Sequence, residues 1–239
     1  MPEKLPAPYD LRVDVVSHGA TAYWQIDRAK TDRISGYNIY LTLESLKDKF
    51  VDWEKDHPAP HNFSPYPGDT DGDRSKESYE ITGLENGRAY YVSVRTVEQG
   101  GRESNPSNEV EFTPLARGVF VISSNHSAEI GGFNFESESS MPARDLRCDI
   151  YLYAKGDTIG LSSPGRLGAG LRKTYFSRPG IINIREMDSI RISENERITA
   201  TGKFGRAELT VRKINLQGAD EAEATLEYIF YPAPPEAGK

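Results

Sequence analysis

The 239-residue sequence contains a single cysteine, Cys148. A disulfide bond within the chain is therefore excluded, and so is a zinc site built from several cysteines. No apolar run approaches the roughly 18 to 20 residues that a membrane-spanning helix needs. The opening residues, MPEKLPAP, also lack the apolar segment of a secretory signal peptide.

The sequence also lacks an excess of positive charge. Its net charge is −7, and the halves differ: residues 1–114 carry 13 Lys+Arg and 20 Asp+Glu, whereas residues 115–239 carry 16 of each. Neither half has the basic surplus of a nucleic-acid-binding protein, so no nucleic-acid partner is expected. With only four histidines, no Ser-His-Asp or Cys-His arrangement can be nominated. We therefore expect a protein without enzymatic activity and without a cofactor.

Aromatic and turn-forming residues are abundant. Tyrosine occurs 13 times, phenylalanine 9 times, glycine 21 times and proline 15 times, a mixture that suits short strands joined by turns. In the first half, apolar and polar residues alternate within successive segments. The predicted strands there are 11–16, 20–27, 36–43, 78–84, 89–97 and 108–114. This pattern predicts an all-β chain whose first domain, residues 1–114, is a β-sandwich.

Several residues of the first domain occur together as a characteristic set. They are Pro8, Leu11, Trp24, Gly36, Tyr37, Tyr40, Leu84, Tyr90, the stretch 103–110, Phe112, Thr113 and Pro114. With this set the domain resembles a fibronectin type III domain, an immunoglobulin-like sandwich. Trp24 is expected to fill the centre between the two sheets. Leu84 and Tyr90 match a tyrosine corner, in which a phenol hydroxyl ties a loop to the sandwich.

The resemblance implies a spacer or a protein-binding module, although the fold by itself implies little about function. In bacteria such domains are mostly extracytoplasmic. We therefore expect a secreted or cell-envelope protein, periplasmic or a surface lipoprotein, from which a leader has been removed.

A long insertion, residues 43–77, departs from the fibronectin type III pattern, and insertions of this length are often functional. Its first part, 43–56, spaces apolar residues as in a one-sided helix. Its second part is rich in proline, and Pro58 and Pro60 forbid a helical metal-binding pair of histidines. The candidate partner-binding residues are Trp53, His57, His61, Phe63 and Tyr66. The alternative is that this stretch folds back over the sandwich edge.

The end of the insertion contains alternating acidic residues, Asp69, Asp71 and Asp73. With Glu80 at the twelfth position they resemble a calcium-binding loop. Arg74, however, occupies the sixth position, where such a loop needs glycine, and Glu80 lies within a predicted strand. We therefore interpret the stretch as a solvated acidic turn, with calcium as the alternative.

The second half, residues 115–232, also reads as strands and predicts a second all-β domain, either a sandwich or a small open barrel. The predicted strands are 118–124, 131–137, 148–153, 174–177, 180–184, 196–202, 206–214 and 224–232, with one turn over 140–147 and a disordered tail at 233–239. Cys148 alternates with two apolar residues, which predicts a buried structural thiol.

A glycine-rich basic segment, 166–173, lies within the second domain. No helix is predicted to begin within its glycines, so it is not a phosphate-binding loop, and it is interpreted as a flexible connection between strands. Arg166, Arg172 and Lys173 nevertheless concentrate positive charge, which makes an anionic ligand a candidate.

The order and spacing of strands in the second half loosely resemble the β-domains of small bacterial envelope lipoproteins, some of which bind haem. The haem-binding members use pairs of histidines, whereas only His126 is available here, so haem binding is not implied.

The leading hypothesis is a non-catalytic, extracytoplasmic bacterial binding or adhesion protein with a protein or polysaccharide partner in the cell envelope. The alternative is the accessory carbohydrate-binding portion of a secreted polysaccharide-acting system. An enzyme with an unrecognised site is the third alternative.

Overall fold

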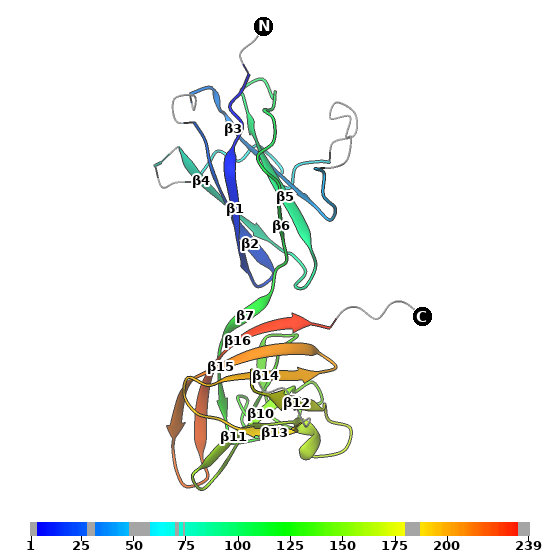
Figure 1. Ribbon diagram of the computed structural model, residues 1–239, viewed down its shortest axis with the longest axis vertical. Helices are drawn as coiled ribbons and strands as arrows, with labels where there is room; N and C mark the ends of the chain where they lie inside the picture. Colours follow the sequence, from blue (N-terminus) through cyan, green and yellow to red (C-terminus); the bar gives the residue numbers. More distant parts are fainter. Residues whose placement is uncertain are drawn as a thin grey trace, which may run out of the picture. The chain divides into compact units, whose positions relative to one another are not determined.

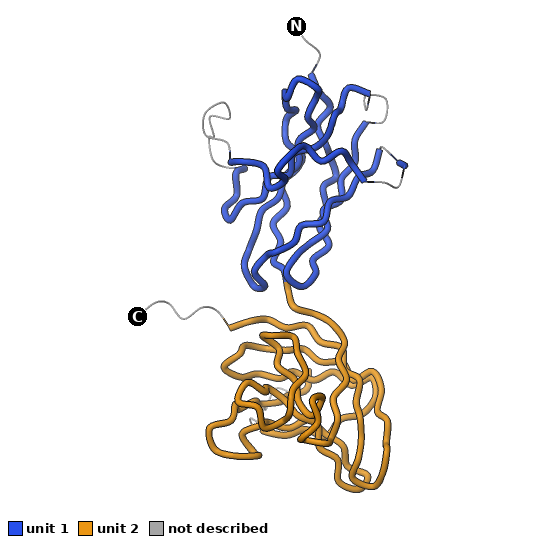
Figure 2. Tube along the Cα trace, turned by 180° about the vertical axis from the view of Figure 1, so that it is seen from behind, with its two compact units in different colours: residues 1–114 blue, residues 115–239 orange. Residues whose placement is uncertain are grey.

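The computed structural model describes residues 4–27, 32–47, 58–69, 72–73, 75–179 and 187–233. It divides into two compact units, residues 1–114 and 115–239 (Figure 2). Among the described residues no helix combines the length and the apolar character required to cross a membrane. One turn of 3-10 helix, η2, is formed by Pro164–Arg166.

The first unit consists of two three-stranded antiparallel sheets (Figure 1). One has the order β1-β2-β4 and the other the order β3-β5-β6. The strands are β1 Tyr9–Val16, β2 Gly19–Gln25, β3 Gly36–Thr42, β4 Lys76–Thr82, β5 Tyr90–Val97 and β6 Val110–Phe112. The all-β fold and the immunoglobulin-like sandwich of the first domain are thus confirmed.

Alternation along the strands builds the core of this unit, because successive side chains of a strand point to opposite faces. In β2 the buried residues are Ala20, Ala22 and Trp24, while Tyr23 between them is exposed. The Trp24 ring is 1% exposed and meets the ring of Tyr37 edge-on, with 5.1 Å between centroids. Trp24 therefore joins the two sheets, as its position in the sequence predicts.

The tyrosine corner predicted from Leu84 and Tyr90 is present. The phenol oxygen of Tyr90 accepts a hydrogen bond from the backbone N–H of Glu85 at 3.0 Å. Leu84 is buried, and its N–H donates to the carbonyl oxygen of His18 at 2.9 Å. Two hydrogen bonds therefore fix the start of the turn before β5 to the sandwich.

The second unit consists of two five-stranded antiparallel sheets. One has the order β13-β11-β10-β8-β9, with strands β8 Gly132–Asn134, β9 Ser139–Met141, β10 Ile150–Lys155, β11 Thr158–Ser162 and β13 Ser189–Arg191. The other has the order β12-β14-β15-β16-β7, with strands β7 Ala116–Ser123, β12 Thr174–Ser177, β14 Arg197–Gly202, β15 Gly205–Leu216 and β16 Ala222–Pro232. Neither sheet closes into a barrel in the part of the chain described. Of the two architectures predicted, this is the sandwich.

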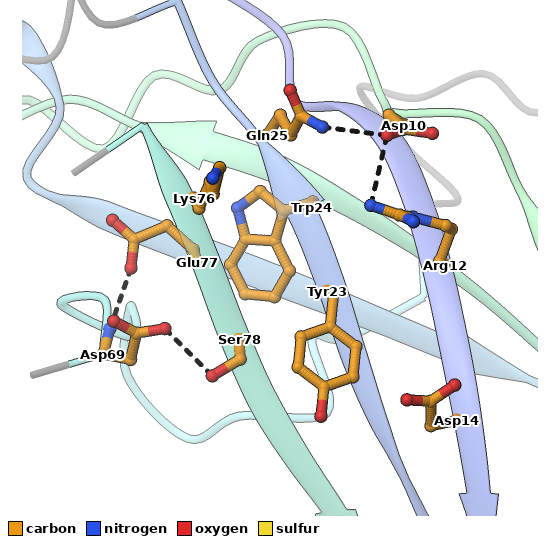
Figure 3. Close-up of a pocket in the computed structure, with 10 residues that line it drawn as sticks. All are labelled: Asp10, Arg12, Asp14, Tyr23, Trp24, Gln25, Asp69, Lys76, Glu77 and Ser78. Carbon is orange, nitrogen blue, oxygen red and sulfur yellow. Dashed lines mark hydrogen bonds and ion pairs between the residues drawn. The ribbon is translucent and has the colours of Figure 1, made fainter. Parts of the chain in front are cut away.

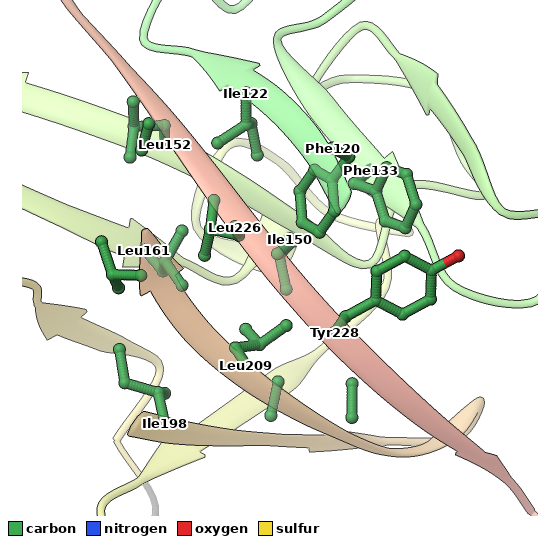
Figure 4. Packing of buried hydrophobic residues seen from close by; sticks show 14 of the residues in the cluster. Phe120, Ile122, Phe133, Ile150, Leu152, Leu161, Ile198, Leu209, Leu226 and Tyr228 are labelled. Atoms are coloured by element: carbon green, nitrogen blue, oxygen red, sulfur yellow. The ribbon is translucent and has the colours of Figure 1, made fainter. Parts of the chain in front are cut away.

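One apolar cluster fills the space between these sheets, with aromatic rings concentrated at one end. Figure 4 shows Phe120 of β7, Phe133 of β8 and Tyr228 of β16 beside one another. The Phe120 and Phe133 rings stack with centroids 3.8 Å apart, and Tyr228 meets Phe120 at 5.7 Å. The Tyr228 hydroxyl is satisfied at the edge of the core by Glu138, to which it donates at 2.8 Å.

The helix predicted over residues 43–56 is wrong where the structure describes it, because residues 43–47 form bends and a turn. The carboxylate of Glu109 explains the difference. It accepts hydrogen bonds from the Ser45 hydroxyl and, at 2.9 Å, from the Leu46 N–H. Residues 48–56 lie outside the described residues, as do the predicted strand 180–184 and most of the tail.

Three strands of the second unit were not predicted: β9, β11 and β13. The segment 140–147 begins in β9 and continues as turns. The basic segment 166–173 begins in η2 and leads to β12. Cys148 is fully buried, as predicted, and burial raises the pKa of its thiol to about 12.

The tyrosine corner gives a test of what holds the first unit together. Tyr90→Phe removes the acceptor for the Glu85 N–H and should lower the free energy of unfolding by about 1 to 3 kcal/mol, the cost of leaving a partly buried donor unpaired. Urea denaturation of the full chain measures this change. Tyr23→Phe is the control, since its ring lies on the outer face of β2; equal effects of the two substitutions would contradict the role given to Tyr90.

Candidate functional site

Residues 61–66 of the insertion lie along the edge of β3 that is not paired with β5. The backbone N–H of His61 donates to the carbonyl oxygen of Ile39 at 2.7 Å, and Tyr37 and Tyr66 exchange two backbone hydrogen bonds of 2.8 Å each. The segment satisfies backbone groups that an edge strand would otherwise present to other chains.

The side chain of Asn62 strengthens this attachment. Its Oδ1 accepts the N–H of Ile39 at 2.8 Å. Its Nδ2 donates to the carbonyl oxygen of Tyr37 at 2.9 Å and to that of Ser64 at 2.7 Å. The amide therefore replaces a strand partner, and it fixes the loop 61–66 from both sides.

The aromatic residues of this loop separate into two groups. The rings of His61 and Tyr66 meet the ring of Tyr79 edge-on, at 6.2 Å and 5.0 Å between centroids. This packing agrees with the interpretation that the stretch folds back over the sandwich edge. Phe63, in contrast, is 107% exposed and projects into solvent. Desolvation lowers the pKa of His61 and so favours its neutral form.

Two of the candidate residues, Trp53 and His57, lie outside the described residues. The same holds for Asp71 of the acidic stretch. Their roles remain expectations from the sequence.

The described aspartates of the acidic stretch have local structural roles. Asp69 Oδ2 accepts a hydrogen bond from the Ser78 hydroxyl at 2.9 Å. Asp73 Oδ1 accepts the backbone N–H of Ser75 at 3.1 Å and its hydroxyl at 2.6 Å, which closes a turn before β4. Within the described ranges, no group of three or more His, Cys, Asp or Glu side chains could hold a metal ion.

Asp69 also borders a hollow of about 460 Å³ at the sheet β1-β2-β4 (Figure 3). Asp10 is held there by Gln25 Nε2 at 2.9 Å and by Arg12 at 3.4 Å, and the exposed ring of Tyr23 lies between the strands. Four carboxylates and two cations line the hollow, namely Asp10, Asp14, Asp69 and Glu77 against Arg12 and Lys76. It is a net acidic polar surface.

Glu77 is the buried carboxylate of this hollow. It is 7% exposed and comes from the inner face of β4. It accepts hydrogen bonds from the Tyr37 hydroxyl at 3.2 Å and from the Asp69 N–H at 2.8 Å. These bonds satisfy the charge within the protein and link the insertion to the sandwich.

The two arginines of the basic segment, Arg166 and Arg172, are paired with carboxylates of the same chain. Arg166 donates to Asp188 at 2.8 Å and to the Ser189 hydroxyl at 3.1 Å. Arg172 donates to Glu136 at 2.7 Å and to Asp149 at 2.8 Å. The segment therefore attracts an added anion less strongly than its sequence suggests.

Lys173, the third candidate of the basic segment, is exposed. Whether the three cations bind an anion together stays a prediction.

Asp149 is the charged group that sequence reasoning missed. It is fully buried, and its Oδ2 accepts hydrogen bonds from the Phe135 N–H at 2.9 Å and from Asn134 Nδ2 at 3.0 Å, while Arg172 binds Oδ1. Burial raises the pKa of Asp149 to about 6, and the bonds from Phe135 and Arg172 offset this only in part. The sequence did contain a signal for a buried charge, because Asp149 lies between Cys148 and Ile150 at the start of an apolar strand.

Asp149 gives a pH prediction. Its folded-state pKa lies above that of the unfolded chain, so the native state binds the proton more tightly, and stability falls as the pH rises from about 4 through about 6. Relative to Asp149→Asn, the wild type should lose up to about 3 kcal/mol across this range, at 1.36 kcal/mol per pKa unit. Denaturant unfolding at each pH measures the difference, and NMR titration of the carboxyl carbon gives the pKa. A constant difference would contradict the prediction.

Comparison with known proteins assigns the first unit to a family. The family model described as "Fibronectin type III domain" matches residues 6–113. No curated protein matches the chain significantly.

Among solved structures, the chain is similar to an alpha-L-rhamnosidase from Dictyoglumus thermophilum, with 10% identity over 94% of this chain and 25% of that one, and a TM-score of 0.32. It is also similar to the FN1–FN3 domains of chicken CNTN1, with 12% identity over 84% of this chain and 63% of that one, and a TM-score of 0.28. The chain thus spans a quarter of the rhamnosidase and less than two thirds of the CNTN1 fragment.

The residues matched by the family model coincide with the unit that contains the two three-stranded sheets, the central Trp24 and the tyrosine corner at Tyr90. Residues 6–113 of the chain are a fibronectin type III domain.

Proposed function

We propose that this protein is a non-catalytic binding or adhesion protein that acts outside the bacterial cytoplasm, secreted or in the cell envelope. Fibronectin type III domains commonly act as binding modules, and they are frequently extracellular. The observation that supports a binding role here is Phe63, a fully exposed aromatic ring on a loop that is held in place.

Exposed apolar residues are common on protein surfaces, so exposure alone would not single out Phe63. The loop around Phe63 does single it out, because the neighbouring residues are hydrogen-bonded to β3. These residues are His61 and Asn62 before it and Tyr66 after it. A side chain presented from a fixed loop loses little conformational freedom when a partner covers it. Burial of an aromatic ring then supplies binding energy of about 1.5 to 3 kcal/mol. The partner proposed is a protein or polysaccharide of the envelope with an apolar recess.

The test uses the full chain and its Phe63→Ala variant against cell-envelope material and against cytosol of the source organism. Wild type should bind the envelope material saturably, and Phe63→Ala should bind about 10-fold more weakly, since 1.4 kcal/mol corresponds to a factor of ten. Leu146→Ala is the matched control, because Leu146 is a 70% exposed apolar residue of the second unit.

Two results would count against the proposal. If Phe63→Ala bound the envelope material with the affinity of wild type, the loop of Phe63 would not be part of the binding site. Recovery of the native protein in the cytosolic fraction, with no binding to envelope material, would exclude the location.

A second candidate function is the accessory carbohydrate-binding portion of a secreted polysaccharide-acting system. The observation that favours it is a polar hollow of about 670 Å³ on the second unit. This volume lies within the range of ligand-binding sites in proteins, about 300 to 1,000 Å³.

A further inference from the structure

The hollow on the second unit lies on the outer face of the sheet β12-β14-β15-β16-β7. Arg197 of β14, Thr210 of β15 and Glu227 of β16 are direct neighbours across these strands. Thr199, Glu208 and Ile229 form the adjacent row. The hollow therefore has a floor made of short polar side chains and the strands themselves, with longer charged side chains around it.

The strands that form this floor are interior strands of the sheet. β14, β15 and β16 each have a neighbour on both sides, and in the row of Thr199, Glu208 and Ile229 each residue is paired across both of its edges. An extended peptide could not add to them by backbone hydrogen bonding. A ligand of this hollow must be recognised by side chains.

Two of the side-chain pairs offer donors and acceptors next to each other. Arg206 and Glu208 form an ion pair of 3.0 Å with side chains that are 50% and 46% exposed. Arg212 pairs with Glu227, and these side chains are 53% and 43% exposed. Each pair thus presents free N–H groups beside free carboxylate oxygens to solvent.

This arrangement matches neighbouring hydroxyl groups of a sugar, because a hydroxyl both donates and accepts hydrogen bonds. Thr199 and Thr210 add hydroxyls on the floor. Ile229 and Pro179 supply the apolar contacts against which the C–H faces of a sugar ring can pack.

The charges in the hollow identify the kind of sugar. Three arginines and two glutamates line it, so one positive charge remains in excess. Arg206 and Arg212 are paired, whereas the side chain of the exposed Arg197 has neither a hydrogen bond nor an ion pair within the described part of the chain. A free guanidinium binds a carboxylate through two parallel hydrogen bonds.

From these observations we infer that the hollow binds an acidic polysaccharide, a chain of sugars that carries carboxylate groups, with Arg197 on a carboxylate and the Arg–Glu pairs on hydroxyls. The inference rests on the second candidate function and gives it a site and a ligand class. It is independent of Phe63, which lies on the other unit.

The experiment titrates the full chain with polygalacturonate, as the acidic probe, at low salt by calorimetry. Wild type should bind it, and Arg197→Ala should bind about 10-fold more weakly. Arg144→Ala, which removes an exposed arginine on the segment between β9 and β10, should bind as wild type. Equal melting temperatures of the variants would establish that each is folded.

Two further probes separate sugar recognition from charge alone. Poly-L-glutamate has carboxylates but no hydroxyls and should bind at least 10-fold more weakly than polygalacturonate. Dextran has hydroxyls but no carboxylates, so its binding should be weak and unchanged by Arg197→Ala.

Three outcomes would overturn the inference: no binding of polygalacturonate by wild type, equal binding of poly-L-glutamate, or no effect of Arg197→Ala. The Phe63→Ala variant distinguishes the two proposals. This variant should bind polygalacturonate as wild type does, because Phe63 is on the other unit. If Phe63→Ala binds envelope material as wild type does while Arg197→Ala loses polygalacturonate, only the proposal for Phe63 fails. If Phe63→Ala loses envelope binding while wild type does not bind polygalacturonate, only the proposal for the hollow fails.

Discussion

Both units depend on the burial of one face of every sheet against the other sheet of the same unit. With only two layers, each strand must contribute its apolar side chains to the single core between them. Trp24 fills this role in the first unit, and the rings around Phe120 fill it in the second. The inner faces are therefore used entirely for stability. Recognition is left to the outer faces, the loops and the strand edges. The loop of Phe63 and the hollow around Thr210 are found there.

The sequence predicted the strands of the first unit well, because the alternation is regular and turn residues separate the strands. It also predicted the tyrosine corner, since the spacing of Leu84 and Tyr90 is local. The error over residues 43–47, the described start of the predicted helix, has a long-range origin instead. Apolar spacing at three and four residues suits a helix, but the Glu109 carboxylate binds Ser45 and Leu46 where the helix would begin. A contact with a residue so distant in sequence cannot be read from periodicity.

The site residues were harder to predict than the strands for the same reason. Phe63 was among the candidates, but nothing in the sequence indicated that Asn62 would fix its loop to β3. The hollow on the second unit depends on the register of β14, β15 and β16. A shift of one of these strands by one residue would turn all its side chains to the opposite face. A register irregularity between Val211 and Lys213 adds to this dependence. The basic segment shows the converse, since a cluster of arginines is paired with distant carboxylates such as Asp149.

The position of β16 has a consequence for the order in which the protein is made. This strand lies between β15 and β7, so the first strand of the second unit finds its sheet partner only in the last strand of the described chain. The first unit needs no later residues for its sheets, whereas β7 leaves the ribosome long before its partner exists. Domains fold as units from the N-terminus during synthesis, and distant pairings form slowly. The fibronectin type III domain is thus able to fold while the second unit is still incomplete.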